Sequence, residues 1–142
     1  MLNLWDALGH PGRFLETVPD AERGKSAIHG YGLFSTRQRV AGEHVMTLDG
    51  QAVAVEAVPE ALFALEWNAL SEHVLLVRPL RTSYGYINHS TAPNLVIAGD
   101  GANVSAARFI AAGEELTLDY AAQPLPRQYL EAPQAAYLRL SA

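Results

Sequence analysis

Short apolar runs separated by glycine or proline characterise the chain from about position 24 onward. The runs read "VMTL", "QAVAV", "HVLLVRPL", "NLVIAG", "VSAARFI" and "ELTLDY". Runs of this length, bounded by residues that favour tight turns, predict many short β-strands. We therefore expect a mostly β fold built from small sheets.

Two stretches predict helices. The stretch 59–70, "PEALFALEWNAL", has Pro59 at a position suited to a first helical turn and apolar residues spaced for one face. The stretch 126–140, "PRQYLEAPQAAYLRL", predicts helical pieces that Pro133 interrupts. Because segment 123–142 remains rich in Tyr and Leu, we expect it to pack on the body of the domain.

The totals indicate one compact domain, 1–142. The chain has 142 residues, of which 49% are apolar and 18% charged, a globular composition. It has no cysteine, which excludes disulfides and Cys-based zinc sites and fits a reducing compartment. The N-terminal stretch lacks the features of a secretory signal, and the apolar runs are too short to span a membrane. We expect a cytoplasmic protein with no membrane partner.

The charge balance is acidic. Ten basic and fifteen acidic side chains give a formal net charge of −5. An acidic chain is a poor candidate for sequence-independent binding of nucleic acid, so we expect no direct contact with DNA or RNA. The charge can attract a basic peptide, although by itself it indicates only solubility.

The first candidate for chemistry is "HGYGLF", which contains Gly30, Tyr31 and Gly32. Two glycines around an aromatic residue allow either a turn or a close approach of the backbone to a ligand. A dinucleotide-binding fingerprint would need a third glycine at position 35, which is Ser35. Taken alone, the pattern favours a plain turn.

The second candidate is "YINHSTAPN", from Tyr86 to Asn94. A strand-like start is followed by a cluster of hydrogen-bonding side chains that includes Asn88 and His89. Such a cluster can serve turn chemistry alone, or it can hold a polar ligand. No second histidine stands at metal-ligand spacing, so we predict no metal site.

The third candidate is "AAGEELTLDY". Glu114 and Glu115 are neighbours, and neighbouring residues on a strand point to opposite faces, so we expect a solvated turn and not a catalytic pair. Tyr120 at the end of the run is either a core residue with its hydroxyl bonded or a catalytic phenol at a strand end.

Four motifs in this order resemble the SET domain family of protein lysine methyltransferases, here as a small stand-alone protein. They are "HGYGLF", "AGEHVMTLDG", "NHSTAPN" and "GEELTLDY", and they span about residues 24–122. The resemblance implies a SET-domain, β-clip-like fold of small curved sheets with few short helices. It also implies a C-terminal pseudoknot, an exception to the usual unthreaded topology, which would bring positions 88 and 120 together.

The resemblance also implies roles for individual residues. S-adenosylmethionine (SAM) would be the cofactor, and Tyr120 would border the methyl-transfer channel as the catalytic residue. The implied cofactor-binding residues are Gly30, Tyr31, Gly32, Asn88 and His89. The implied channel residues are Leu48, Tyr84, Tyr86 and Leu118. Leu48 and Leu118 depart from the family pattern, because those places often hold aromatic residues.

Three functions remain open at this stage. The leading hypothesis is a SAM-dependent methyltransferase that acts on a lysine in a protein or peptide, expected to be basic. The second is a SET-fold module that binds SAM or a basic peptide without methylating it, and the third is a β-rich structural domain. Segment 123–142 is expected either to cover the substrate channel or to form a contact in a homodimer.

Overall fold

The computed structural model describes residues 14–56 and 59–140 of the chain. Within these ranges ten short strands form four small sheets, and the helices are all short. The mostly β fold class is therefore confirmed. The N-terminal stretch 1–13, for which we expected no secretory signal, lies outside the described residues.

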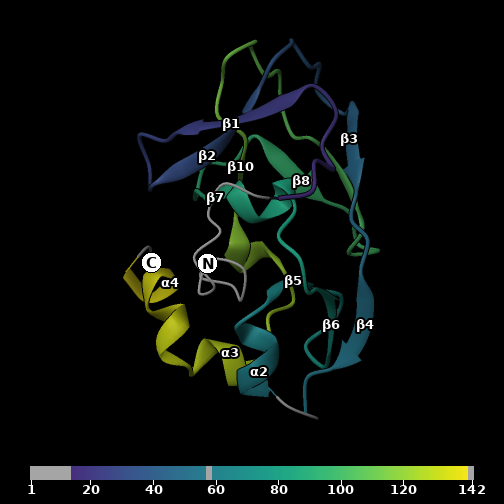
Figure 1. The fold of residues 1–142 in the computed structure, drawn as a ribbon, viewed down its shortest axis with the longest axis vertical. Coiled ribbons are helices and arrows are strands. Elements are labelled where there is room, and N and C mark those ends of the chain that lie inside the picture. The colour runs from purple at the N-terminus through teal and green to yellow at the C-terminus, as the bar shows by residue number, and fades with distance from the viewer. Residues whose placement is uncertain (1–13, 57–58, 141–142) are drawn as a thin grey trace.

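Three of the sheets are antiparallel and the fourth is parallel. The antiparallel sheets are the hairpin β1 (Ala21–Lys25) and β2 (Tyr31–Ser35); the sheet β3 (His44–Thr47), β9 (Asn103–Ala106) and β8 (Leu95–Ile97); and the sheet β4 (Gln51–Ala54), β6 (Val74–Arg78) and β5 (Glu66–Ala69). The parallel pair is β7 (Asn88–His89) with β10 (Thr117–Leu118). Figure 1 shows the β1–β2 hairpin at one end of the molecule and β4, β5 and β6 at the other.

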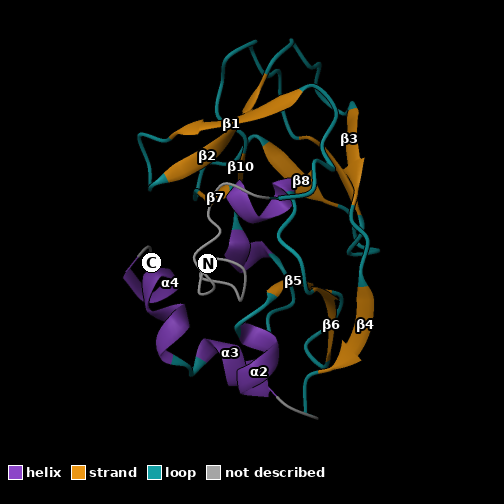
Figure 2. Cartoon of the chain, viewed as in Figure 1, coloured by secondary structure: helices purple, strands orange, loops and turns teal. Residues whose placement is uncertain are grey.

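The helices α2, α3 and α4 gather on one side, next to the β4–β6–β5 sheet, as Figure 2 shows. The α-helices are α2 (Pro59–Phe63), α3 (Arg127–Leu130) and α4 (Ala136–Leu140). The 3₁₀ turns are η1 (Ser83–Tyr86), η2 (Tyr120–Ala122) and η3 (Pro133–Ala135). Segment 126–140 is thus helical in pieces, as predicted, and Pro133 begins a new turn.

The helix predicted over 59–70 is wrong beyond Phe63. Glu66–Ala69 is instead the strand β5, buried along its whole length and paired with β6. The Glu66 carboxylate lies 2.5 Å from Arg78 Nε and also accepts hydrogen bonds from the backbone and side chain of Thr82. An extended backbone places Glu66 between these partners, and burying a carboxylate without them would be costly.

Two further boundaries differ from the sequence prediction. Tyr86, expected to begin a strand, ends the 3₁₀ turn η1, and the strand is β7. Strand β1, with the charged sequence "AERGK", was not predicted from hydrophobicity, and it forms by pairing with β2. In both cases the strand forms where a partner strand is available: β7 pairs with β10, and β1 pairs with β2. The local sequence pattern does not encode these partners.

The apolar residues form two clusters. One lies among the sheets of the β1–β2 end and contains Leu33, Val104 and Leu116. The other lies between the β4–β6–β5 sheet and the C-terminal helices, where Trp67 packs edge-on against Tyr129 at 4.8 Å between ring centroids. Tyr129 and Ala135 of the C-terminal segment are therefore part of this second core, and Leu125, Tyr137 and Leu138 pack against it.

Candidate functional site

The parallel pairing of β7 with β10 joins two distant motifs. Asn88 stands opposite Thr117, and His89 stands opposite Leu118. Just beyond the pair, the backbone N–H of Tyr120 donates a hydrogen bond of 3.0 Å to His89 Nδ1. The structure therefore brings positions 88, 89 and 120 together, as the predicted topology requires.

Asn94 fixes this arrangement from the buried side. Its Oδ1 accepts a hydrogen bond of 2.8 Å from the Thr117 backbone N–H, and its Nδ2 donates to the Glu115 carbonyl at 2.7 Å. The same Nδ2 donates to the Glu114 carboxylate at 2.9 Å. One buried amide thus holds the loop after β7 against the strand that ends at Tyr120.

Glu114 and Glu115 do not form the solvated turn that we expected. Both are half-buried, and they point in opposite directions, as neighbours on an extended chain do. The Glu114 carboxylate lies 2.6 Å from Arg108 Nη2, and hydrogen bonds from Arg108 and Asn94 lower the pKa of Glu114 to about 2. Glu115 faces the opposite way, toward Ser26 and Asn88. Each carboxylate has a structural partner that the sequence pattern did not reveal.

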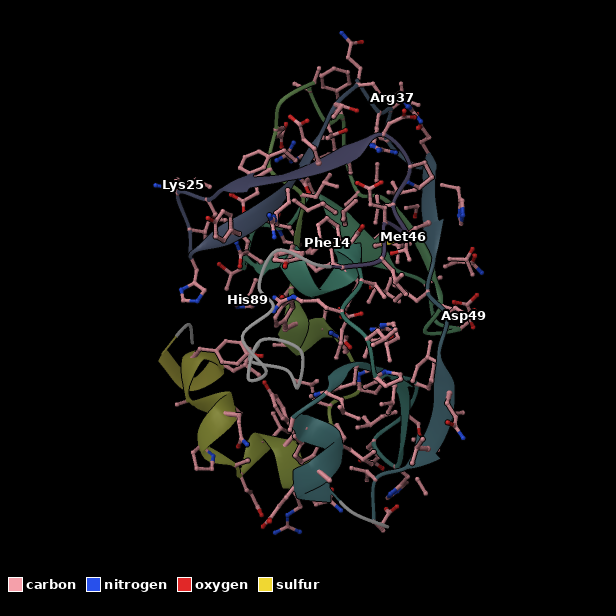
Figure 3. All side chains as sticks on the ribbon, viewed as in Figure 1. Phe14, Lys25, Arg37, Met46, Asp49 and His89 are labelled. Carbon is pink, nitrogen blue, oxygen red and sulfur yellow. The ribbon has the colours of Figure 1, made fainter. Side chains whose placement is uncertain are left out.

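A cavity of about 660 Å³ opens beside the β7–β10 pair. Its lining residues come from five parts of the chain: Ile28, His29, Phe63, Ala64, Asn88, His89, Tyr120, Tyr129, Gln134 and Tyr137. Figure 3 shows His89 on the side of the ribbon that carries the C-terminal helices, with Met46 and Asp49 on the other side. The volume lies within the range of small-molecule and cofactor sites.

His89 forms part of the cavity wall with a defined tautomer. Because Nδ1 accepts the N–H of Tyr120, the ring proton lies on Nε2. Asp119 Oδ1 lies 3.8 Å from the same Nδ1, which is too long for a hydrogen bond, so we do not interpret this contact as an ion pair. Among the described residues Nε2 has no hydrogen-bond partner, although it is buried. The imidazole thus has a donor without a partner among the described residues, and its ring packs against the rings of Tyr120 and Tyr137.

The amide of Asn88 is surrounded by more acceptors than it can serve. Its Nδ2 lies 2.9 Å from Glu115 Oε2, 3.1 Å from both Ser26 Oγ and the His29 carbonyl, and 3.2 Å from the Tyr31 carbonyl. An amide nitrogen carries only two hydrogens. The region between β7 and the 26–31 loop is therefore rich in oxygen acceptors and includes one carboxylate, which suits a cationic donor.

Tyr120 has its ring at the cavity and its hydroxyl in the protein. The hydroxyl donates to the carbonyl of Ile87. Burial raises the pKa of Tyr120 well above its ordinary value, so the phenol keeps its proton near neutral pH. With its proton committed to Ile87, the oxygen retains lone pairs that can accept a further weak hydrogen bond.

The two predicted glycines lie next to the cavity, which the neighbouring His29 lines. Gly30 has a φ of +47° in a turn closed by a hydrogen bond of 2.9 Å from Ser26 N to the Gly30 carbonyl. Gly32 lies within β2, and the Tyr31 side chain is 52% exposed. Gly30, Tyr31 and Gly32 are not among the residues that line the cavity, and the Tyr31 carbonyl accepts from Asn88 Nδ2.

The four predicted channel residues all belong to one buried cluster and lie outside the lining of the 660 Å³ cavity. Leu48 lines a separate cavity of about 350 Å³, and Leu118 a third of about 290 Å³. Tyr84 and Tyr86 lie in η1, where burial raises the pKa of Tyr84 to about 12. A continuous channel through these four residues stays a prediction.

Several residues of the site were missed by the sequence analysis. Tyr129 and Tyr137 share a hydrogen bond of 2.8 Å between their hydroxyls at the cavity wall. Tyr129 and Tyr137 lie in a segment that Pro133 interrupts. Their positions in the sequence gave a weak indication of packing and no indication of a binding site. Glu115 and Ser26 were missed because only tertiary structure brings them to Asn88.

The described ranges contain neither a metal-binding cluster nor a membrane-spanning helix. Within residues 14–56 and 59–140, no three His, Asp or Glu side chains are grouped so that they could hold a metal ion. In the same part of the chain, no helix has the length and apolar character needed to cross a membrane.

Comparison with known proteins identifies the fold. Residues 30–121 match the family model of the SET domain. A structure of ctPRC2 in complex with H3K27me3 is similar, with 23% identity over 78% of this chain and 15% of that chain and a TM-score of 0.60. A humanized mutant of the Chaetomium thermophilum Polycomb Repressive Complex 2, bound to the inhibitor GSK343, has 22% identity over 85% and 17% of the two chains and a TM-score of 0.61.

A further structure, the Polycomb Repressive Complex 2 of Chaetomium thermophilum, has 20% identity over 82% of this chain and 18% of that chain, with a TM-score of 0.59. The present chain thus spans less than a fifth of the length of these solved chains. At these identities the likeness shows the fold alone. No curated protein matches the chain.

Proposed function

The chain belongs to the SET domain family, and from that premise we propose that it is a SAM-dependent protein-lysine N-methyltransferase. Members of this family are typically enzymes of that kind. The observation that carries the proposal is the parallel β7–β10 pairing, which places Asn88, His89 and Tyr120 on one cavity. The acceptor is proposed to be a lysine in a protein or peptide.

Residues at the cavity and beside it offer groups that suit SAM. The carbonyls of His29 and Tyr31, with the Glu115 carboxylate nearby, supply acceptors for an ammonium group. The aromatic wall that includes Tyr129 suits a flat base, and His89 Nε2 offers a donor to it. When bound, SAM supplies the methyl group on a positively charged sulfur.

The protein is proposed to contribute to methyl transfer by aligning the reacting groups and by excluding water from them. Holding two reacting groups in line can contribute about 7–11 kcal/mol in favourable cases. Tyr120 is proposed to orient the acceptor amine, since its oxygen faces inward and its proton is held by Ile87. The acceptor lysine must lose its proton first, and apolar surroundings such as Leu48 and Leu118 favour the neutral amine.

The C-terminal helices are proposed to cover the cofactor. Tyr129 from α3 and Tyr137 from α4 line the same cavity as His89, and their hydroxyls bind each other. Tyr129 is also anchored in the core against Phe63 and Trp67. The two roles expected for segment 123–142, a cover over the substrate channel or a contact in a homodimer, stay predictions, because these contacts lie at the cavity proposed for the cofactor.

Two observations favour a second function, a module that binds SAM or a peptide without catalysis. Leu48 and Leu118 bring no polar atom to the proposed channel, and the Tyr120 hydroxyl already has a partner in Ile87. In that case the cavity would bind its ligand as described, but the acceptor amine would lack a second polar group to orient it.

Incubation with isotope-labelled SAM and a panel of basic proteins, followed by mass spectrometry, tests the proposal. Transfer of label to lysine that is lost in Tyr120→Phe would support the enzyme. Binding of SAM and a basic peptide without transfer would replace it by the binding module. Absence of SAM binding at millimolar concentration would reject the enzyme, and absence of both SAM binding and basic-peptide binding would leave a structural domain.

A further inference from the structure

Glu115 lies at the centre of a hydrogen-bond network beneath the 26–31 loop. Ser26 Oγ lies 2.8 Å from both oxygens of the Glu115 carboxylate and donates its single proton to it. The same Oγ accepts the backbone N–H groups of Ile28 at 2.9 Å and His29 at 3.2 Å. The carboxylate therefore turns the Ser26 lone pairs toward the loop that borders the cavity.

The same carboxylate orients Asn88. Glu115 Oε2 accepts from Asn88 Nδ2 at 2.9 Å, the shortest of the four contacts that this nitrogen makes. An amide has its donor and acceptor ends on opposite sides, so a carboxylate that takes Nδ2 fixes which way the group points. Asn88 and His29 both line the cavity. The Glu115 carboxylate bonds Asn88 directly and is linked to the His29 backbone through Ser26 Oγ.

Gly32 is explained by this carboxylate. A Cβ placed on Gly32 would lie 2.3 Å from Glu115 Oε2 and 2.7 Å from its Cδ, separations that real side chains do not show. The φ of Gly32 is not positive, so backbone conformation does not demand glycine there. Gly30 differs, because it has a φ of +47° and open space where a side chain would stand.

We infer that Glu115 is a positioning residue for the cofactor site, and that position 32 is glycine because the Glu115 carboxylate occupies the place of a side chain there. The inference deepens the proposed function and rests on it. Glu115 acts through Ser26 on the loop and directly on Asn88, and its negative charge favours a cationic ligand among the loop carbonyls.

A double-mutant cycle separates this role from direct cofactor contact at Gly32. SAM affinity is measured by calorimetry for wild type, Gly32→Ala, Glu115→Ala and the double variant. Each single change is expected to weaken SAM binding about tenfold, or about 1.4 kcal/mol. Residues in contact typically show coupling energies of this size. The Glu115→Ala background removes the two closest neighbours of a methyl group added at position 32 and leaves Ser26 Cβ at 3.2 Å. Gly32→Ala should therefore cost clearly less SAM affinity there than in wild type. Equal costs in both backgrounds would overturn the inference.

Two companion variants guard against a general loss of structure. Glu115→Gln keeps the volume, so it should not relieve Gly32→Ala, and it should retain more SAM affinity than Glu115→Ala. Glu114→Gln is the matched control, because its carboxylate faces Asn94 and Arg108 on the other side of the chain. It should leave SAM affinity unchanged, and a loss equal to that of Glu115→Gln would contradict the assignment.

Hydrogen exchange tests the inference without cofactor. The amides of Ile28 and His29 should exchange faster by about tenfold in Glu115→Ala, because the Ser26 hydroxyl loses its orienting partner. They should change less in Glu115→Gln, because the Gln oxygen can still accept the Ser26 proton. Glu114→Gln should not alter them. Wild-type protein that binds no SAM would reject the proposed function, yet the exchange result would still stand for or against Glu115. Unchanged exchange in Glu115→Ala would overturn the positioning role.

Discussion

Replacing Tyr120 by Phe removes one oxygen from a buried position and keeps the ring. The hydroxyl donates to the Ile87 carbonyl, so the change deletes a hydrogen bond and leaves a buried acceptor without this donor. Such a loss costs about 1–3 kcal/mol in the free energy of unfolding. SAM affinity should change less than twofold, because the proposed cofactor contacts lie on Asn88, His89 and the loop. Turnover should fall by roughly a hundredfold, since alignment is felt mainly in the transition state.

Three measurements on one preparation test this expectation: urea unfolding, calorimetry with SAM, and the rate of methyl transfer. Ser35→Ala is the control, because it removes another buried hydroxyl away from the cavity lining, one that donates to the Arg37 carbonyl at 2.7 Å and accepts from Arg39 Nε at 2.9 Å. The control should lose at least as much stability as Tyr120→Phe and keep its rate. A Tyr120→Phe protein that methylates as fast as wild type would refute the catalytic assignment and leave Tyr120 as a structural residue.

Three other changes have defined outcomes. Asn88→Ala should weaken SAM binding by about 1–3 kcal/mol in calorimetry, because it removes a partly buried amide from the acceptor cluster. Glu66→Ala should lower the free energy of unfolding by about 3–5 kcal/mol in urea, because it leaves the buried Arg78 guanidinium without its carboxylate. The pKa of Glu114 is lowered to about 2 by Arg108 from an ordinary value of 4.5, so its stabilisation is present above about pH 4.5 and lost as the pH falls toward 2. Glu114→Gln should flatten the acid-unfolding curve in that window, and an unchanged curve would contradict this account.

Strands whose own residues show an apolar run between turn residues could be predicted from the sequence. Apolar runs between glycines gave β3, β4, β6, β8 and β9 approximate positions, because alternation and turn residues act locally. The four motifs in order identified the family, and they pointed to Asn88, His89 and Tyr120. The structure brings these three residues onto one cavity. Their roles toward a cofactor remain predictions.

Other parts of the site carried no local signal. "EALFALEWNAL" has helical periodicity, yet Glu66–Ala69 is a strand, since Glu66 is held by Arg78 and Thr82. Glu115 looked like half of an exposed acidic turn, and only the neighbouring β1–β2 hairpin gives it Ser26 as a partner. Patterns within a few residues do not specify such contacts, because the partners lie far apart in the chain.

The amino-acid sequence by itself determined that this protein is a mostly β SET domain with tight turns. Short apolar runs and glycines act locally, and the order of the motifs can be read directly along the chain. Only the tertiary structure decided how its polar groups are used. The parallel β7–β10 pair unites segments about thirty residues apart, and the C-terminal helices add Tyr129 and Tyr137 to the same cavity. The Glu115 carboxylate fills the space beside Gly32. Buried polar groups must find partners wherever the folded chain brings them, and that requirement acts across space and not along the sequence.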